Sequence, residues 1–227
     1  MVFAVILAGG VGSRMGSNVT KQRMLVAGKS VIWHTVTAFD RCPDIDRIIV
    51  VSRADEIEYM KKELSDISKL CYITEGGATR AESSYRGICA IGDECSFVAI
   101  HDAARCLITS NDISRIVCVA RSKGAATATT RIADTVKRVD VCGKIVETID
   151  RDCLVAAATP QVFAYPAIRS AFETSESLGA EITDDNMLYE RAGGVVYTVD
   201  LECDNFKITT PRDILLAELI LKERNNV

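Results

Sequence analysis

The chain has 227 residues, 48% of them hydrophobic, so it is long enough to bury a substantial core. It carries 27 basic and 31 acidic residues, a net charge of −4, which argues against general binding to nucleic acid or to a membrane surface. No proline-rich or low-complexity stretch indicates a linker, so we expect a single domain over residues 1–227 in which positive charge matters locally.

The first predicted element is a buried strand that runs into a glycine cluster. Residues 3–8 are apolar with β-branched members, and three glycines follow them at Gly9, Gly10 and Gly12. Glycines let the backbone approach an anion closely, and Arg14 and Lys21 supply positive charge. This pattern favours a phosphate site, although a tight connection without a ligand is the alternative. Met15 stands where a dinucleotide fold needs its third glycine.

Further along, apolar stretches alternate with amphipathic ones. Predicted strands cover 46–52, 70–74, 97–101 and 125–129, and predicted helices cover 31–40, 55–65, 80–91 and 110–122. This alternation is typical of an α/β fold with a mostly parallel sheet and helices on both faces. Ligands of such sheets bind beyond the carboxyl ends of the strands, which is where the glycine cluster falls.

Two polar segments also follow predicted strands. The glycines of segment 75–84 could pass close to a flat base, but Thr79 with Glu82 also matches an ordinary helix start with a capping box. Asp102 follows the strand at 97–101, a natural position for holding Mg²⁺ against phosphate oxygens. A structural ion pair with Arg105 is the alternative interpretation.

Between residues 132 and 148 the α/β pattern is interrupted. Two polar and apolar alternating segments flank a turn at 140–143, which is typical of a β-hairpin. Because a hairpin is marginal alone, it must pack against the body or another subunit. We therefore expect a β-arm for dimerisation over residues 132–153.

The last part of the chain returns to mixed elements. Predicted helices cover 166–178, a short stretch after Asp184 and Asp185, and Pro211 to about Arg224, and a predicted strand covers 195–199. Polar clusters at 159–161 and 183–185 are either site groups or, for the two aspartates, an acidic first helical turn. Lys207 is predicted at the end of a short strand, where it either faces an anion or is solvated.

Nine cysteines are scattered without Cys-x-x-Cys spacing, and no apolar segment has the flanks of a signal peptide or the length of a membrane span. We therefore expect reduced thiols packed as small apolar groups, no zinc site and a cytoplasmic protein. His34 and His101 are expected to be structural.

Several short motifs follow one another along nearly the whole chain. They are Ala8-Gly9-Gly10-x-Gly12-x-Arg14-Met15-Gly16, Lys21-Gln22, Gly76-Gly77-x-x-Arg80 with Ser83, His101-Asp102-Ala103-Ala104-Arg105, Asp134-Thr135-x-Lys137, Thr148-x-Asp150-Arg151, Thr159-Pro160-Gln161-x-Phe163, Thr183-Asp184-Asp185 and Asn205-x-Lys207-Ile208-Thr209. Together they resemble the cytidylyltransferases that make CDP-methylerythritol from 2-C-methyl-D-erythritol 4-phosphate and CTP. The resemblance implies a Rossmann-like nucleotidyltransferase, a homodimer whose hairpin arms complete each other's sites.

The resemblance also implies roles for individual residues. The catalytic residues would be Arg14, Lys21 and Lys207. CTP would be bound by Ala8, Gly9, Gly10, Gly12, Gly77, Arg80, Ser83, Asp102 and Ala104, with the Ser83 hydroxyl on the cytosine edge. The sugar-alcohol phosphate would be bound by Arg105, Thr135, Arg151, Thr159, Thr183 and Asp184. Asp102 would also hold Mg²⁺ or another divalent cation.

Three departures from the family pattern leave alternatives open. Residues 7–10 read Leu-Ala-Gly-Gly, common in sister enzymes that activate ribitol 5-phosphate, while Cys106 replaces a usual proline and Val155 a usual tryptophan. Ribitol 5-phosphate is therefore the alternative acceptor, although segments 134–137 and 148–151 favour methylerythritol phosphate. A nucleotide-binding regulator without catalysis is a more remote alternative. No nucleic acid or membrane partner is expected.

Overall fold

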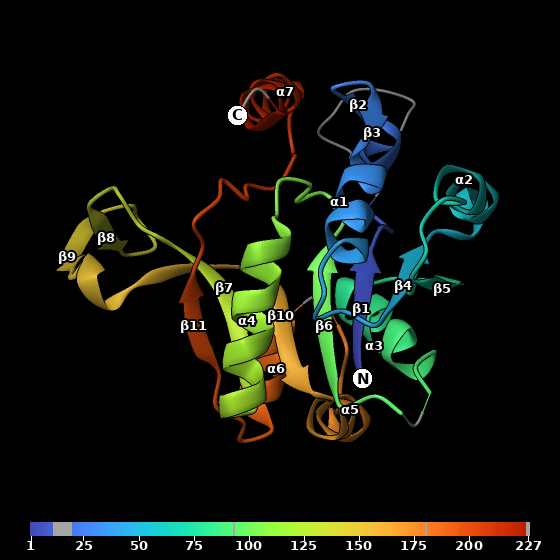
Figure 1. The fold of residues 1–227 in the computed structure, drawn as a ribbon. Helices are drawn as coiled ribbons and strands as arrows, with labels where there is room; N and C mark the ends of the chain where they lie inside the picture. The colour runs from blue at the N-terminus through green and yellow to red at the C-terminus, as the bar shows by residue number, and fades with distance from the viewer. Residues whose placement is uncertain (11–19, 93, 180, 226–227) are drawn as a thin grey trace.

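The computed structural model describes residues 1–10, 20–92, 94–179 and 181–225, and its centre is a seven-stranded sheet (Figure 1). In spatial order the strands are β11 (Tyr197–Asp200), β7 (Ala125–Arg131), β10 (Val155–Ala164), β6 (Phe97–Asp102), β1 (Val2–Leu7), β4 (Arg47–Ser52) and β5 (Leu70–Glu75). Neighbouring strands run parallel except where β10 pairs antiparallel with β6 and β7. The predicted mostly parallel sheet is confirmed.

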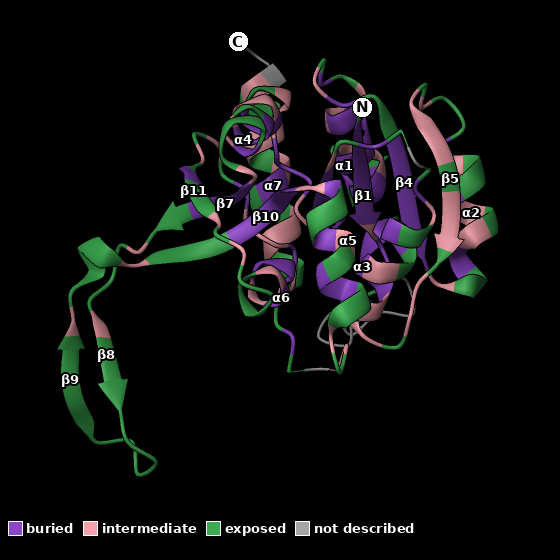
Figure 2. Ribbon diagram, turned by 90° about the horizontal axis from the view of Figure 1, so that it is seen from below, coloured by how far each residue is buried: buried purple, intermediate pink, exposed green. Residues whose placement is uncertain are grey.

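Helices cover both faces of this sheet. One face is covered by α1 (Val31–Asp40), α2 (Ile57–Glu63) and α4 (Ser110–Lys123), and the other by α3 (Arg80–Cys89), α5 (Tyr165–Thr174) and α6 (Asp185–Arg191). Strand β1 shows why, since its side chains alternate between the two layers. Ala4 and Ile6 pack in the first layer, Phe3 and Val5 in the second, and all four are buried (Figure 2). A strand covered on both sides is apolar throughout, as the sequence of β1 is.

Local side chains determine where several helices begin. Ser30, Thr79 and Thr109 precede α1, α3 and α4, and each hydroxyl accepts a hydrogen bond from a backbone N–H in the first turn. Thr79 therefore caps α3 as predicted, while the Glu82 carboxylate accepts from the backbone N–H of Ala78 at 2.7 Å. The helix start interpretation of segment 75–84 is confirmed, and it places residue 80 at the beginning of α3.

Strand β10 was not predicted, because Pro160 lies within it and proline cannot donate a ladder hydrogen bond. The pairing of β10 with β7 shifts register between Ala157 and Gln161, and this irregularity accommodates the proline. The antiparallel insertion carries Thr159 and Gln161 into the middle of the sheet, where both are buried.

The prediction of a short strand at Lys207 is wrong. Residues 204–209 have no regular structure, and the backbone N–H of Ile208 donates to the carbonyl of Ala104 at 2.8 Å. The predicted helix at 166–178 also ends earlier, because α5 stops at Thr174. A small unpredicted hairpin joins β2 (Leu25–Val26) to β3 (Lys29–Ser30) through Gly28, whose φ of 81° suits glycine.

This small hairpin and α7 (Pro211–Asn225) lie beyond the carboxyl ends of the central strands (Figure 1). They share a third apolar cluster that includes Val26, Cys106 and Ile208. Burial raises the pKa of the Cys106 thiol to about 12, so this cysteine is an inert packing group. No helix among the described residues is long and apolar enough to cross a membrane.

All nine cysteines are free thiols, as expected, but their expected burial is only partly correct. Cys42, Cys95 and Cys106 are buried, whereas four cysteines are exposed, at positions 89, 118, 142 and 153. The exposed ones lie on outer helix faces and on the hairpin region, where there is no core to cover them. Apolar packing therefore does not explain their presence.

The predicted hairpin forms and projects away from the sheet (Figure 2). Strands β8 (Val136–Val139) and β9 (Ile145–Ile149) pair antiparallel, and Arg138 forms an ion pair with Glu147 at 3.0 Å. Apolar side chains are exposed along it, at Val139, Val141, Ile145 and Val146. An isolated two-stranded hairpin is marginal in water, and these apolar side chains are left uncovered by the described part of the chain.

Gly87 lets α3 approach β1 and β4 closely, because a Cβ there would contact Val5 and lie 2.8 Å from Cγ2 of Val51. We expect Gly87→Ala to lower the free energy of unfolding by about 1–2 kcal/mol in urea titrations, since overpacking outweighs the gain in helix propensity. Gly92→Ala is the control, since no described atom lies within 4 Å of a Cβ built there. A Gly87→Ala protein as stable as the wild type would contradict this packing.

Candidate active site

A cavity of about 290 Å³ opens at the carboxyl ends of the central parallel strands. Its described lining draws on the beginning, middle and end of the chain: Leu7, Gly9, Gly10, Lys21, Gln22, Gly77, Ala78, Thr79, Arg80, Ser83, Asp102, Ala104 and Lys207. This is the edge at which ligands of parallel α/β sheets bind. Most of the residues predicted to bind the nucleotide therefore meet in one place. Ala8 adjoins this lining, buried and bonded through its backbone N–H to the carbonyl of Val51 at 2.7 Å.

Some predicted residues do not line this cavity or lie outside the described chain. Gly12 and Arg14 are outside the described residues. Thr135 and Arg151 are exposed at the hairpin, and the Arg151 guanidinium donates to the carbonyl of Ala133. Thr183 is exposed, with its hydroxyl 3.7 Å from the sulfur of Met187.

Asp102, at the end of β6, is the centre of charge in the cavity. Nε of Arg80 donates to Oδ1 at 3.1 Å, and Nζ of Lys207 donates to Oδ2 at 2.8 Å. The predicted partner Arg105 is more distant, with Nε 3.9 Å from Oδ2. Burial alone raises the pKa of Asp102, but the charges of Arg80 and Lys207 outweigh it and hold the pKa well below its usual range. The carboxylate of Asp102 is therefore ionised in the folded protein at neutral pH.

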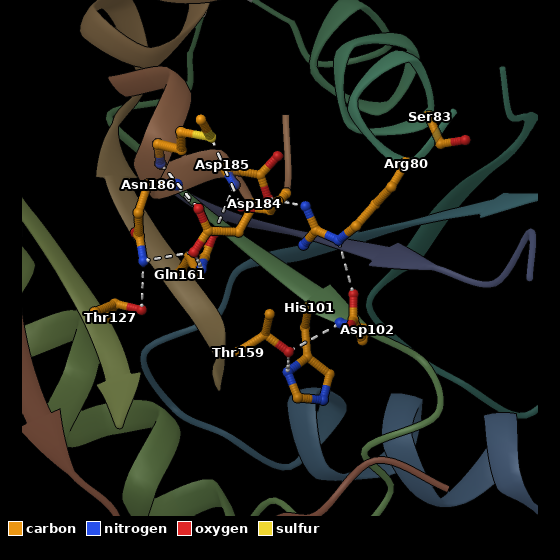
Figure 3. A network of polar contacts seen from close by, with 12 residues as sticks. Arg80, Ser83, His101, Asp102, Thr127, Thr159, Gln161, Asp184, Asp185 and Asn186 are labelled. Carbon is orange, nitrogen blue, oxygen red and sulfur yellow. Dashed lines mark hydrogen bonds and ion pairs between the residues drawn. The ribbon is translucent and has the colours of Figure 1, made fainter. Parts of the chain in front are cut away.

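Arg80 lies between two carboxylates, as Figure 3 shows. Its Nη1 donates to Oδ2 of Asp185 at 2.8 Å, while its Nε faces Asp102. Burial lowers the pKa of Arg80, but the two carboxylates more than compensate and raise it. Burial raises the pKa of Asp185, and contact with Arg80 opposes that shift. The guanidinium is thus a fixed cation shared between helix α6 and strand β6.

Asp184 and Asp185 have different roles that their sequence did not separate. Asp184 caps α6: its Oδ1 accepts from the backbone N–H of Met187 at 2.9 Å. Asp185, one residue later, is fully buried and faces Arg80. Asp184 was predicted to bind the acceptor, yet here its carboxylate holds the helix start. In the sequence, Asp185 stood out only as the second aspartate of the Thr183-Asp184-Asp185 motif. Its partner Arg80 lies 105 positions away, so the sequence did not indicate this pairing.

Gln161 on β10 attaches the start of α6 to the sheet. Its Oε1 accepts from the backbone N–H groups of Asp185 at 3.0 Å and Asn186 at 3.3 Å. Its Nε2 donates to Oδ2 of Asp184 at 2.8 Å, and Nδ2 of Asn186 donates to the hydroxyl of Thr127 at 3.0 Å (Figure 3). A buried network with paired members of this kind is rigid, so the position of Asp185 is fixed.

His101 and Thr159 fix the backbone of Asp102. The N–H of Asp102 donates to the Thr159 hydroxyl at 3.0 Å. Nε2 of His101 lies 3.1 Å from the carbonyl of Arg105, which can only accept, so Nε2 carries the proton of the neutral ring. Nδ1 of His101 therefore accepts from the Thr159 hydroxyl, also at 3.0 Å. His101 is structural, as expected. Thr159 was predicted to bind the acceptor, and in this structure its hydroxyl is hydrogen-bonded to Asp102 and His101.

The loop before α3 is held narrow by Ser83. Its hydroxyl accepts from the backbone N–H of Gly77 at 3.1 Å and donates to the carbonyl of Thr79 at 2.9 Å. A Cβ at Gly76 would lie 2.8 Å from this hydroxyl oxygen, so the glycine is needed for the close approach. Ser83 was predicted to meet the cytosine edge, and in this structure it holds the loop that lines the cavity.

The described cavity lining offers one carboxylate, that of Asp102, as a ligand for a divalent cation. No cluster of three or more His, Cys, Asp or Glu residues in the described part of the chain could enclose a metal ion. Asp102 is the only carboxylate among the described lining residues, and each of its oxygens accepts one short hydrogen bond. Mg²⁺ is usually bound by one or two carboxylates together with phosphates and waters. Asp102 could therefore hold such an ion only together with a phosphate ligand.

Comparison with known proteins gives a consistent result. A family model described as 2-C-methyl-D-erythritol 4-phosphate cytidylyltransferase matches residues 2–223. The enzyme of that name from Clostridium perfringens strain SM101 is 40% identical over 223 residues, which cover 97% of this chain and 99% of that protein. Its counterpart from Alkaliphilus oremlandii is 37% identical, covering 97% and 94%. The crystal structure of 4-diphosphocytidyl-2C-methyl-D-erythritol synthase from Anaerococcus prevotii superposes with a TM-score of 0.85 at 29% identity, covering 97% and 96%.

His101 makes the stability of this region depend on pH. Burial lowers the pKa of His101 to about 3, whereas the pKa of a histidine in the unfolded chain is about 6.5. Between these values the unfolded chain binds the proton and the folded chain does not, so stability rises with pH across this window and the full contribution is present above it. We expect His101→Gln to reduce this dependence by up to about 1.4 kcal/mol per pH unit below about pH 6, measured by urea unfolding. Identical pH slopes in both proteins would contradict a buried neutral imidazole.

Proposed function

This chain belongs to the 2-C-methyl-D-erythritol 4-phosphate cytidylyltransferase family, and we propose that the cavity around Asp102 performs that family's reaction. The chain transfers the cytidylyl group of CTP to 2-C-methyl-D-erythritol 4-phosphate, giving CDP-methylerythritol and pyrophosphate. One observation carries the proposal: Lys21, Arg80 and Lys207, from three distant segments, line one cavity at the carboxyl edge of the sheet. Such a cationic site suits a triphosphate.

The reaction is a single in-line displacement. An oxygen of the acceptor phosphate forms a bond to the α-phosphorus of CTP, and the bond from that phosphorus to the bridging oxygen breaks, so pyrophosphate leaves with the electron pair. No protein nucleophile is needed. Because two polyanions must meet, catalysis is mainly positioning and stabilisation of negative charge.

Lys21 and Lys207 supply charge in this cavity. Lys21 is buried in a short turn, Lys21–Arg23, and lines the cavity. Its ammonium would contact the triphosphate. Lys207 is held by Asp102 and neutralises the α-phosphate. By the same family resemblance, Arg14 joins Lys21 on the triphosphate. The backbone of Gly9, Gly10 and Gly77 offers a flat surface for the cytosine ring, since no side chain projects from it.

Asp102 would hold Mg²⁺ or another divalent cation together with phosphate oxygens. Such an ion lowers the repulsion between CTP and the acceptor phosphate. The role of the protein is to keep the carboxylate ionised and oriented, and Arg80, Lys207 and the Thr159 hydroxyl do this.

The free thiols further suggest a reducing compartment, so we place the protein in the cytoplasm.

The acceptor site is completed by a second copy of the chain. Thr135 and Arg151 lie on the projecting hairpin, and neither lines the cavity of its own chain. A homodimer in which each hairpin reaches the partner's cavity would cover the exposed valines and isoleucine of β8 and β9. Arg151 suits the acceptor phosphate because a guanidinium pairs two phosphate oxygens at once.

The acceptor is tested directly by supplying CTP and Mg²⁺ with either sugar-alcohol phosphate and measuring pyrophosphate release. We expect release with 2-C-methyl-D-erythritol 4-phosphate. Release with ribitol 5-phosphate alone would overturn the acceptor, and residues 7–10, Leu-Ala-Gly-Gly, are the feature that favours this second candidate. CTP binding without release in either case would overturn the transfer reaction.

Sharing of sites between subunits predicts recovery of activity in mixtures. Lys21→Ala and Arg151→Ala should each lower turnover by about 100- to 1,000-fold, the cost of a lost transition-state donor. Random mixing makes half of the dimers mixed, and one of their two sites keeps both residues, so about one quarter of wild-type activity should return. The measurement is pyrophosphate release after subunit exchange has been verified by mass spectrometry.

Mixing two separately prepared batches of Lys21→Ala is the control, because no intact site can form in it. Activity in the Lys21→Ala and Arg151→Ala mixture no higher than in this control, with exchange complete, would overturn the shared site.

A further inference from the structure

Asp185 contacts the cavity's charges without lining the cavity. Its carboxylate is fully buried behind Arg80, 2.8 Å from Nη1, and it is absent from the described cavity lining. Arg80 in turn reaches Asp102 with Nε at 3.1 Å (Figure 3). Oδ2 of Asp102 lies 2.8 Å from Nζ of Lys207. Four groups of alternating charge therefore run from the start of α6 to the segment before α7.

We propose that Asp185 is a positioning residue for cytidylyl transfer: by neutralising Arg80, it leaves Asp102 available to hold Lys207 in the cavity. This inference rests on the proposed function. It assigns Asp185 no contact with CTP or the acceptor, only an effect that passes through Arg80.

The burial of Arg80 shows why the Asp185 carboxylate matters. Arg80 is mostly buried, with a side chain 25% exposed, so water does little to screen its charge. With Asp185 present, the guanidinium is shared between two carboxylates. Without it, the whole charge of Arg80 would act on Asp102 and draw that carboxylate away from Lys207.

Lys207 depends on this arrangement more than a lysine on a helix or strand would. Its segment, 204–209, has no regular structure, and its side chain is 40% exposed. The contact with Asp102 therefore determines where the ammonium lies. A weaker contact would leave Lys207 distributed over several rotamers, and the charge would be misplaced in the transition state.

The position of Asp185 is built into the fold independently of helix capping. Asp184 already caps α6, and Gln161 accepts from the backbone N–H of Asp185. The Asp185 side chain is thereby turned toward Arg80 and makes no capping bond in the described structure. A buried acid held this firmly beside an arginine that faces the cavity is a positioning device rather than a general stabiliser of the helix.

The test compares Asp185→Asn with a matched control, Asp112→Asn. Asp112 is also buried and accepts from an arginine, Nη1 of Arg115 at 2.9 Å, but it lies at the start of α4 and is absent from the cavity lining. We expect Asp185→Asn to lower kcat by about 10- to 100-fold with little change in KM for CTP. Asp112→Asn should keep the wild-type kcat, and thermal unfolding must show that both variants are folded.

A second measurement does not require turnover. The nitrogen of Lys207 can be acetylated only after its ammonium has left the carboxylate of Asp102 and lost a proton. Acetylation of Lys207, followed by peptide mass spectrometry, should therefore be severalfold faster in Asp185→Asn than in Asp112→Asn. If the wild type shows no turnover with any acceptor, the proposed function fails, and this labelling still tests the coupling.

A double-mutant cycle identifies the route through Arg80. In an Arg80→Met background, Asp185→Asn should cause no further loss of kcat, because the group through which it acts is gone. A wild-type kcat and unchanged Lys207 labelling in Asp185→Asn would overturn the proposal. So would losses that add fully in the double variant.

Discussion

The ion pairs of Asp102 are the interaction on which the cavity depends. Arg80, Arg105 and Lys207 come from separate segments and would repel one another in a partly buried space. The ionised carboxylate of Asp102 at the end of β6, together with that of Asp185 behind Arg80, offsets that repulsion and orients the cations. A cavity meant for a polyanion can then be assembled before the polyanion arrives, which is how preorganised charge contributes to catalysis.

The sheet provides the geometry that makes these contacts possible. Parallel β1 and β6 bring the glycine cluster and Asp102 to the same edge, and antiparallel β10 inserts Thr159 and Gln161 beside them. The hydroxyl of Thr159 fixes the backbone of Asp102, and the amide of Gln161 fixes the start of α6. The charged groups therefore rest on a rigid neutral network, and a small displacement in that network would misplace the phosphates.

The separation of the hairpin from this cavity has a chemical consequence. Lys21, Arg80 and Lys207 of one chain line a single cavity, whereas Thr135 and Arg151 lie on a projection whose apolar side chains are exposed. If the acceptor site is shared, as we propose, then dimer formation and acceptor binding depend on the same surface. The site around Asp102 would bind CTP in either oligomeric state.

The sequence alone determined the features that depend on neighbouring residues: the strand and helix periods, Thr79 as a helix cap, the hairpin at 132–148, and the motifs that mark the family. Tertiary structure decided the rest. Strand β10 contains Pro160 and forms only with the irregular pairing to β7 that accommodates a proline. Asp185 could not be distinguished from Asp184 until helix α6 turned one carboxylate toward Arg80. Lys207 lies on an irregular segment, and its ammonium donates to a carboxylate 105 residues away. Local patterns report backbone preference and burial, whereas contacts between distant charges depend on how the layers pack, and no short stretch of sequence encodes that.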